Sequence, residues 1–200
     1  MCIRDSAYVA RHGADPDVIA DLERDAERLS GLLDGLLALA REDAATAPLE
    51  EGVRLDQVAR TAGGGDPLVE LTATAAVTVR GDRVALQRLV ENLLENARRH
   101  GPGGGRVRLS VRGEDGQALV EVSDEGPGPA PGEAERTFER FWRAPGARGE
   151  GSGLGLAIVR VTAERHGGRA GVEGSRFWVE LPTAGAKADV SGPDRALAST

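Results

Sequence analysis

Two asparagines and one arginine recur at helical spacing in the stretch RLVENLLENARRH, residues 88–100. Asn92 and Asn96 are four residues apart and Arg99 follows three residues later, so at about 100° per residue all three share one sector. Asparagine is a mediocre helix former, because its amide competes for backbone hydrogen bonds. Amide oxygens suit magnesium, and an arginine can bind a phosphate through two hydrogen bonds. The spacing therefore indicates a site for magnesium and phosphate, with an ordinary solvated helix edge as the alternative.

The other side chains of this helix have simpler predicted roles. Its buried side is expected to consist of Leu86, Leu89, Val90, Leu93, Leu94 and Ala97. Glu91, Glu95 and Arg98 are expected to face away from the asparagines. Asp82 is expected to cap the helix, since aspartate side chains accept hydrogen bonds from the first unpaired N–H groups of a helix.

Two glycine-rich stretches follow the helix. In VSDEGPGPAP, residues 122–131, a predicted strand delivers Asp124 into a turn, where its carboxylate can accept a hydrogen bond from an exocyclic amine. The glycines of this turn allow a flat ring to approach the backbone. In GEGSGLGLAIVR, residues 149–160, glycines open a predicted helix whose free N–H groups favour an anion. Each stretch alone is also typical of an ordinary turn, but together with the asparagine helix they indicate nucleotide binding.

The elements that must position these residues are a mixture of strands and helices. Residues 106–124 alternate apolar and polar side chains about Asp115-Gly116, a strong hairpin signal. The helix that begins near residue 153 is expected to end at Gly167-Gly168. The other predicted strands are 53–55, 68–73, 76–81, 170–174 and 176–182, with a helix at 55–62. These elements predict an α/β fold, an α+β two-layer sandwich with a mixed, hairpin-rich sheet covered by helices on one face.

A long helix is predicted before this body, at about residues 16–43. Its apolar residues recur at alternating intervals of four and three, the a/d pattern of a coiled coil or bundle, at Leu22, Ala26, Leu29, Leu33, Leu36 and Ala40. Leu32, Leu37 and Leu39 widen this stripe and favour a four-helix arrangement, which one helix cannot form alone. A partner chain is therefore expected.

Composition and charge exclude several classes of function. The net charge of −7 argues against nucleic acid as the main partner, because no basic surplus exists to neutralise phosphates. The single cysteine, Cys2, excludes a disulfide framework and a cysteine-based zinc site. No apolar run reaches the about 18 residues of a membrane-spanning helix, so no membrane contact is expected from this chain. Residues 184–200 are small and polar and are expected to be disordered.

In combination, these stretches resemble the ATP-binding domain of sensor histidine kinases, within the GHKL ATPase superfamily. NLLENARRH is similar to the N box, DEGPG to the G1 box, FERFWR to the F box and GSGLGLAIV to the G2 box. The long helix resembles the second helix of the family's dimerisation and phosphoacceptor domain. The resemblance implies a remnant of that domain at residues 1–46, an ATP-binding domain at 47–183 and the tail at 184–200.

The resemblance also implies roles for individual residues. Asn96 would bind the magnesium that bridges the ATP phosphates, and Asn92 and Arg99 would act as catalytic residues beside the phosphates. Asp124 would accept the adenine amine. The other residues implied to contact ATP, around adenine and at the hinge of the ATP lid, are Gly126, Gly128, Gly151, Gly153, Leu154, Gly155 and Leu156.

The sequence departs from the family pattern at the phosphoacceptor. The motif His-Glu/Asp-Leu-Arg-Thr-Pro is absent, and the three histidines are His12, His100 and His166. His12 lies in a predicted turn and His100 ends the asparagine helix, while His166 is expected to carry partial positive charge that suits a helix C-terminus. A chain with ATP boxes but no acceptor histidine is expected not to phosphorylate itself.

The aromatic loop resembles the family's F box, whereas the last hairpin is a second departure from the family pattern. Phe138 and Phe141 would anchor the near end of the lid or, equally well, pack in the core. The turn at Gly174-Ser175 is shorter than the family's glycine-containing loop and is interpreted as a remnant of it.

The function implied is Mg-ATP-dependent transfer of the γ-phosphate to a histidine in two-component signal transduction. Its implied partners are a second copy of the parent chain and a response regulator, and its implied location is cytoplasmic, below a membrane-anchored parent. Two alternatives remain: a GHKL serine kinase of the anti-sigma class and a non-catalytic nucleotide-binding module. The heptad helix and the F box argue against the first, and the intact ATP boxes argue against the second.

Overall fold

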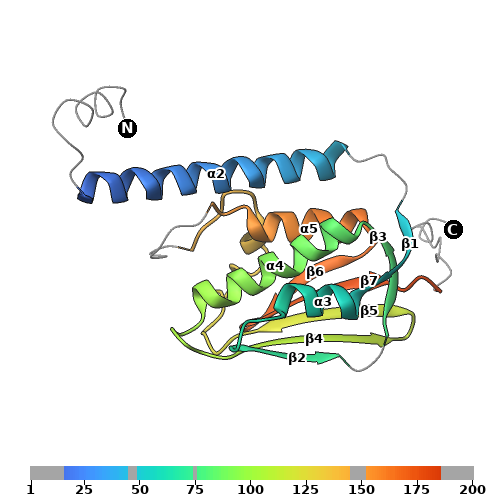
Figure 1. Cartoon of the computed structure of the whole chain (residues 1–200). Coiled ribbons are helices and arrows are strands. Elements are labelled where there is room, and N and C mark those ends of the chain that lie inside the picture. Colours follow the sequence, from blue (N-terminus) through green and yellow to red (C-terminus); the bar gives the residue numbers. More distant parts are fainter. Residues whose placement is uncertain (1–15, 45–48, 74–75, 145–151, 186–200) are drawn as a thin grey trace, which may run out of the picture.

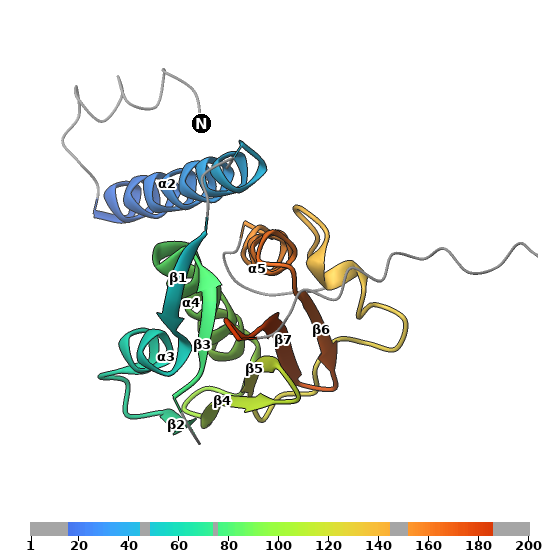
Figure 2. The same cartoon turned by 90° about the vertical axis from the view of Figure 1, so that its right-hand side faces the viewer.

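The computed structural model describes residues 16–44, 49–73, 76–144 and 152–185, which form three layers (Figure 1). The first layer is a five-stranded sheet, and the second consists of α3 (Leu55–Gly63), α4 (Arg83–His100) and α5 (Gly155–Arg165) on one of its faces. The third layer is α2 (Pro16–Ala44), which packs on α5 on the side away from the sheet (Figure 2). The predicted α/β fold with helices on one sheet face is confirmed.

The sheet is mixed, as predicted. Its strand order is β2 (Val69–Ala73), β4 (Val107–Glu114), β5 (Gln117–Ser123), β7 (Arg176–Pro182) and β6 (Arg169–Glu173). β2 pairs with β4 in parallel, and every other pair in this sheet is antiparallel. A separate antiparallel pair is formed by β1 (Glu50–Arg54) and β3 (Thr78–Gly81). β5 is the middle strand of the sheet, so the turn after Ser123 leaves from the centre of one sheet edge.

The β4–β5 hairpin confirms the turn prediction. Asp115 and Gly116 have φ values of 49° and 78°, the left-handed conformations that a two-residue hairpin turn with the twist of its strands requires. The alternating side chains of both strands then divide between the two sheet faces, and Val107, Leu109, Val111, Ala118, Val120 and Val122 are buried under the helices. The hairpin thereby fixes where β5 ends.

α4 begins at the predicted cap. Asp82 Oδ1 accepts hydrogen bonds from the backbone N–H groups of Val84 and Ala85, at 2.9 and 3.1 Å. The predicted apolar side of the helix is almost fully buried against the sheet, with Leu86, Leu89, Val90, Leu93, Leu94 and Ala97 each at most 1% exposed. Burial of each leucine side chain stabilises the folded state by about 1.5–3 kcal/mol. This packing fixes the position of α4 on the sheet and therefore the position of its polar edge.

α5 ends in a contact that corrects the predicted role of His166. The imidazole is buried, its Nε2 accepts the backbone N–H of Asp82 at 3.0 Å, and its Nδ1 lies 2.6 Å from the carbonyl oxygen of Thr162. Because Nε2 accepts a hydrogen bond, the proton is on Nδ1 and the ring is neutral. His166 therefore joins the end of α5 to the start of α4 instead of placing positive charge at a helix terminus.

The two phenylalanines of the aromatic loop differ. Phe138 ends the short 3₁₀ helix η1 (Arg136–Phe138) and is buried, with its ring 6.3 Å from that of Phe177 in an edge-on arrangement. Arg160 of α5 covers the Phe138 ring at 4.7 Å. Phe141 is 56% exposed, so core packing describes Phe138 only.

α2 presents apolar side chains to solvent. Leu29, Leu33, Leu36 and Leu37 are between 45% and 63% exposed. Four half-exposed leucines on one helix are typical of a surface that another helix covers. Among the described residues, no helix combines the length and the apolar character needed to cross a membrane.

Candidate functional site

One cavity of the described chain brings together most of the residues singled out from the sequence. It has a volume of about 710 Å³ and lies between α4, the turn after β5, the segment before α5, and α2. The predicted residues that line it are Asn92, Asn96, Arg99, Asp124, Gly128, Gly153, Leu154, Gly155 and Leu156. A cavity of this size can hold a nucleotide, because small-molecule sites measure about 300–1,000 Å³.

Two predicted residues are not among those that line the cavity. Gly126 contacts a lining residue instead, since its backbone N–H donates to Asp124 Oδ1 at 2.6 Å. Gly151 lies outside the described residues, as do His12 and most of the predicted tail. Ala184, where the tail was expected to begin, still donates its N–H to the Thr78 carbonyl oxygen at 2.9 Å.

The amide edge of α4 contains a buried donor without a partner. Asn92 Nδ2 is inaccessible to solvent and makes no hydrogen bond within the described part of the chain. Its Oδ1 lies 3.1 Å from the position that a Cβ on Gly155 would occupy, so the amide faces the first turn of α5. Leaving a buried donor unpaired costs about 1–3 kcal/mol, and such a group in a cavity wall is typical of a ligand contact.

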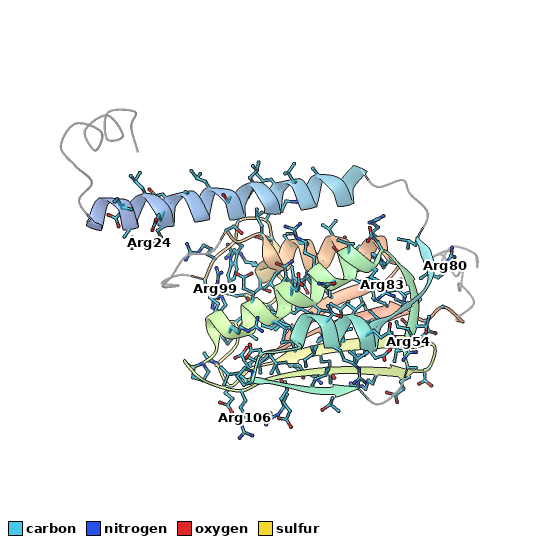
Figure 3. All side chains as sticks on the ribbon, in the orientation of Figure 1. Arg24, Arg54, Arg80, Arg83, Arg99 and Arg106 are labelled. Carbon is cyan, nitrogen blue, oxygen red and sulfur yellow. The ribbon has the colours of Figure 1, made fainter. Side chains whose placement is uncertain are left out.

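Arg99 is paired with Glu95, and this pair corrects one prediction. The Arg99 guanidinium donates to the Glu95 carboxylate one helical turn before it, and both residues line the cavity. Figure 3 shows Arg99 near the C-terminal end of α4, below α2 in that view. Glu95 was expected to face away from the asparagines. It faces the cavity because it is three residues after Asn92 and four before Arg99, which puts all three on one side of the helix.

The Asp124 turn rests on the β6–β7 turn. Ser175 Oγ donates to the Asp124 carbonyl oxygen at 2.8 Å. Gly128 has a φ of 70°, and a Cβ there would lie 2.1 Å from the Gly174 carbonyl oxygen, so no other residue fits. The short Gly174-Ser175 turn, which seemed a reduced element in the sequence, is therefore the support of this wall of the cavity.

The segment before α5 is held by a strained contact. Gly153 has a φ of 68°, and its carbonyl oxygen accepts the Phe141 N–H at 2.9 Å. Phe141 itself has a φ of 64°, a conformation that is uncommon for an aromatic residue and costs about 1–3 kcal/mol. The two residues join the near and far ends of the loop between η1 and α5.

His100 lines the same cavity as a neutral side chain. Desolvation of the ring and the guanidinium of Arg99 lower the pKa of His100 below its ordinary value, while the Asp124 carboxylate opposes this and Arg143 adds to it. The imidazole is therefore uncharged at pH 7, and the cavity's positive charge comes from arginines.

Sequence reasoning missed several residues that line the cavity: Gly31, Gly35, Arg88, Trp142 and Arg143. Arg88 had a signal, because it is one helical turn before Asn92 and so continues the same edge. Trp142 and Arg143 directly follow the F-box phenylalanines, but their spacing carries no helical or strand period. Gly31 and Gly35 belong to α2, and nothing in their local sequence indicates contact with a cavity.

Comparison with known proteins assigns these features to a family. The profile of the histidine kinase-, DNA gyrase B-, and HSP90-like ATPases matches residues 81–185. Sensor protein IrlS of Burkholderia pseudomallei is 36% identical over 183 residues, which are 83% of this chain and 39% of IrlS. Sensor protein kinase PmrB of Pseudomonas aeruginosa is 38% identical over 186 residues, which are 85% of this chain and 38% of PmrB. The chain thus spans well under half the length of these curated relatives.

Solved structures show the same similarity. The mycobacterial sensor histidine kinase MprB matches with a TM-score of 0.59 and 34% identity, over 68% of this chain and 98% of that chain. Full-length ShkA in complex with AMPPNP matches with a TM-score of 0.68 and 29% identity, over 86% of this chain and 39% of that chain.

Proposed function

The chain belongs to the sensor histidine kinases, within the histidine kinase-, DNA gyrase B-, and HSP90-like ATPases, and we propose that it binds ATP with Mg²⁺ and transfers the γ-phosphate to a histidine outside this chain. One observation carries the proposal: a single cavity is lined by the amide edge of α4, by Asp124 and by the glycines at the start of α5. A nucleotide needs two kinds of surroundings in one site: a hydrogen-bond acceptor such as Asp124 for its base, and amide groups and a helix N-terminus for its phosphates.

Asp124 is proposed to bind adenine. Its Oδ1 is already fixed by the Gly126 N–H at 2.6 Å, so Oδ2 is the oxygen that would accept a hydrogen bond from the exocyclic amine. A guanine presents a carbonyl oxygen at the corresponding position, which cannot donate to a carboxylate. The fixed orientation of Asp124 therefore supports selection of ATP over GTP.

The α4 edge and the α5 N-terminus are proposed to hold the phosphates. The unpaired Asn92 Nδ2 donor would gain an acceptor from a phosphate oxygen. Arg99 would add a cation, and the N-terminus of α5 at Gly155 is a favourable place for an anion. These groups would position the γ-phosphate and neutralise its charge, which is most of what a protein contributes to phosphoryl transfer.

Magnesium fits this donor set. No cluster of three histidine, cysteine, aspartate or glutamate side chains that could hold a metal occurs within the described ranges, so an ion would be held by few protein ligands together with the nucleotide. Asn96 lines the cavity one turn after Asn92 and is the proposed ligand. Magnesium prefers such mixed coordination by oxygen ligands and phosphates, and it would reduce the negative charge of the phosphates.

The proposed step is an in-line displacement at phosphorus. A neutral imidazole nitrogen forms a bond to the γ-phosphorus while the bond to the β–γ bridging oxygen breaks, and ADP leaves with that electron pair. The acceptor histidine would come from a bundle helix that packs on the exposed leucines of α2. We further propose that residues 1–46 are part of a dimerisation domain and 47–183 the ATP-binding domain, that the parent acts as a dimer with a response regulator, and that it works in the cytoplasm, where ATP is available.

The first test is nucleotide binding by thermal shift. At 100 times Kd, Mg-ATP should stabilise the wild type by about 2.7 kcal/mol, which is roughly 5–10 °C in Tm for a chain of this size. Asp124→Asn should lose this stabilisation because the amide places a donor beside the adenine amine. Asp115→Asn, the same change in the β4–β5 turn, should retain it. A wild type that no nucleotide stabilises would contradict the proposal.

The second test is phosphate transfer. The chain is incubated with γ-labelled ATP and a separately supplied bundle helix that contains a histidine. Acid-labile label is expected on the supplied helix and not on the chain itself. Label on His12, His100 or His166 would show that the chain contains its own acceptor.

A further inference from the structure

α2 touches the start of α5 as closely as a helix can. Gly35 is buried, and a Cβ at this position would lie 2.8 Å from Leu154 Cδ1 and 3.3 Å from Leu154 Cβ. Leu154 itself is fully buried. A side chain at residue 35 would therefore push against Leu154 and require its Cδ1, and to a smaller extent its Cβ, to shift away from α2.

Leu154 lies between two glycines whose backbone is tightly packed. A Cβ on Gly153 would lie 2.7 Å from the Phe141 carbonyl carbon, and a Cβ on Gly155 would lie 3.1 Å from Asn92 Oδ1. A displacement of the Leu154 backbone would therefore shift the contact with Phe141 on one side and the contact with Asn92 on the other. The position of α2 is in this way coupled to two walls of the cavity.

α2 is also a wall of the cavity in its own right. Gly31 and Gly35 line it on the side opposite the sheet, and Figures 1 and 2 both show α2 crossing above α5. A side chain at Gly31 would meet no atom within 4 Å. Of these two glycines of α2, Gly35 is therefore the one that meets the start of α5.

We propose that α2 is a removable wall of the nucleotide cavity and that Gly35 is the positioning residue that seats it on Leu154. Nucleotide leaves when this contact opens, so the strength of the contact sets the release rate. This inference rests on the proposed function, since it assumes that ATP occupies the cavity. It adds a residue outside the ATP-binding segment to those that control nucleotide exchange.

The first experiment measures release of a fluorescent ATP analogue by stopped flow. Gly35→Leu should increase the dissociation rate about tenfold, which corresponds to about 1.4 kcal/mol, because the new side chain separates α2 from Leu154. Ala40→Leu places the same side chain at an exposed position of α2 and should leave the rate within twofold of wild type. Equal release from Gly35→Leu and wild type would overturn the inference.

A second experiment locks the contact. Gly35→Cys with Leu154→Cys, in a Cys2→Ser background, should form a disulfide after a small shift, because bonded cysteines have Cβ atoms about 3.5–4.5 Å apart. The oxidised variant should release nucleotide at least about tenfold more slowly than the same protein after reduction. Failure to form the disulfide, or equal release before and after reduction, would overturn the inference.

The two proposals fail differently. If wild-type protein binds no nucleotide at equilibrium, the proposed function is wrong, and the disulfide experiment still reports whether α2 sits on Leu154. If wild type binds and neither Gly35 variant changes release, the cavity is a nucleotide site and the contact of α2 with Leu154 does not control release.

Discussion

Arg99 and Glu95 form an ion pair at the mouth of the cavity, and this pair affects how an anionic ligand would enter. Glutamate four residues before arginine is the favourable orientation on a helix, yet such a pair contributes only about 0.3–0.5 kcal/mol when exposed. The side chain of Glu95 is 61% exposed. Phosphate oxygens could therefore replace the Glu95 carboxylate as the partner of Arg99 with a small loss of free energy. The pair keeps the guanidinium at the helix edge without blocking it.

Asn96 has a testable role at this scale. Replacing Asn96 with alanine should remove the extra stabilisation that Mg²⁺ gives to bound ATP, while stabilisation by ATP in EDTA remains. We expect a loss of at least about tenfold in Mg-ATP affinity, the lower end of what metal sites lose when a supporting group is removed. Thermal shift with ATP, with and without Mg²⁺, measures both quantities.

Glu91→Ala is the control for this change. Glu91 is exposed on α4 and bonds to Gln87, and its substitution should leave both responses unchanged. If Mg²⁺ still adds to the stabilisation by ATP in Asn96→Ala, the metal is held by another ligand.

The residues of the site were predictable to the extent that one helix or one turn specifies them. Asn92, Asn96 and Arg99 share an edge because of their spacing, and Asp124 is placed by the end of a strand. Glu95 was assigned to the wrong side of α4. The prediction grouped Asn92, Asn96 and Arg99 and overlooked that Glu95 lies on the same side of the helix. Gly31 and Gly35 could not be predicted as cavity residues, because their place in the cavity depends on how α2 packs on α5.

At the scale of elements, His166 ties the end of α5 to the start of α4. The ring donates through Nδ1 to Thr162 and accepts the Asp82 N–H through Nε2, and it fits because Gly81 leaves room, a Cβ there being 3.0 Å from Nε2. The two helices that form opposite sides of the cavity are thereby joined at the end away from Arg99.

His166→Ala should therefore lower the free energy of unfolding by about 2–4 kcal/mol, because it leaves a cavity and an unpaired Asp82 N–H. His100→Ala, at the exposed end of α4, should change it by no more than about 0.5 kcal/mol. Urea denaturation of both variants without nucleotide checks the prediction. Equal stability of the two variants would show that the His166 bridge does not hold α4 and α5 together.

The elements themselves show which predictions depend on local sequence. The Asp82 cap, the Asp115-Gly116 turn and the end of α5 just before Gly167-Gly168 were predicted because each is fixed by residues within one turn of it. The parallel pairing of β2 with β4 was not specified, because α4 separates the two strands and only packing of that helix brings them together. The same holds for the place of α2 above α5.

At the scale of the whole molecule, the half-exposed leucines of α2 predict self-association. Leu29 and Leu33 are 63% and 59% exposed, and their burial between two copies would remove apolar surface from water. Wild-type protein should form dimers as its concentration rises, and Leu29→Lys with Leu33→Lys should remain monomeric. Sedimentation velocity over a concentration series measures this.

Val84→Lys, which removes an exposed apolar residue from α4 instead (78% exposed), should associate as wild type does. A wild type that stays monomeric at every concentration, or a double variant that associates equally well, would exclude α2 as the interface.

The position of β7 between β5 and β6 has a consequence for how the protein is made. β6 leaves the ribosome before β7 but joins the sheet only through β7, so the nascent chain cannot complete the sheet until residues near Pro182 have emerged. Ser175 and Gly174, which support the Asp124 turn, are set in place by the same strand. The wall of the cavity at Asp124 is therefore completed last during synthesis, and an interrupted translation product has α4 but no complete cavity.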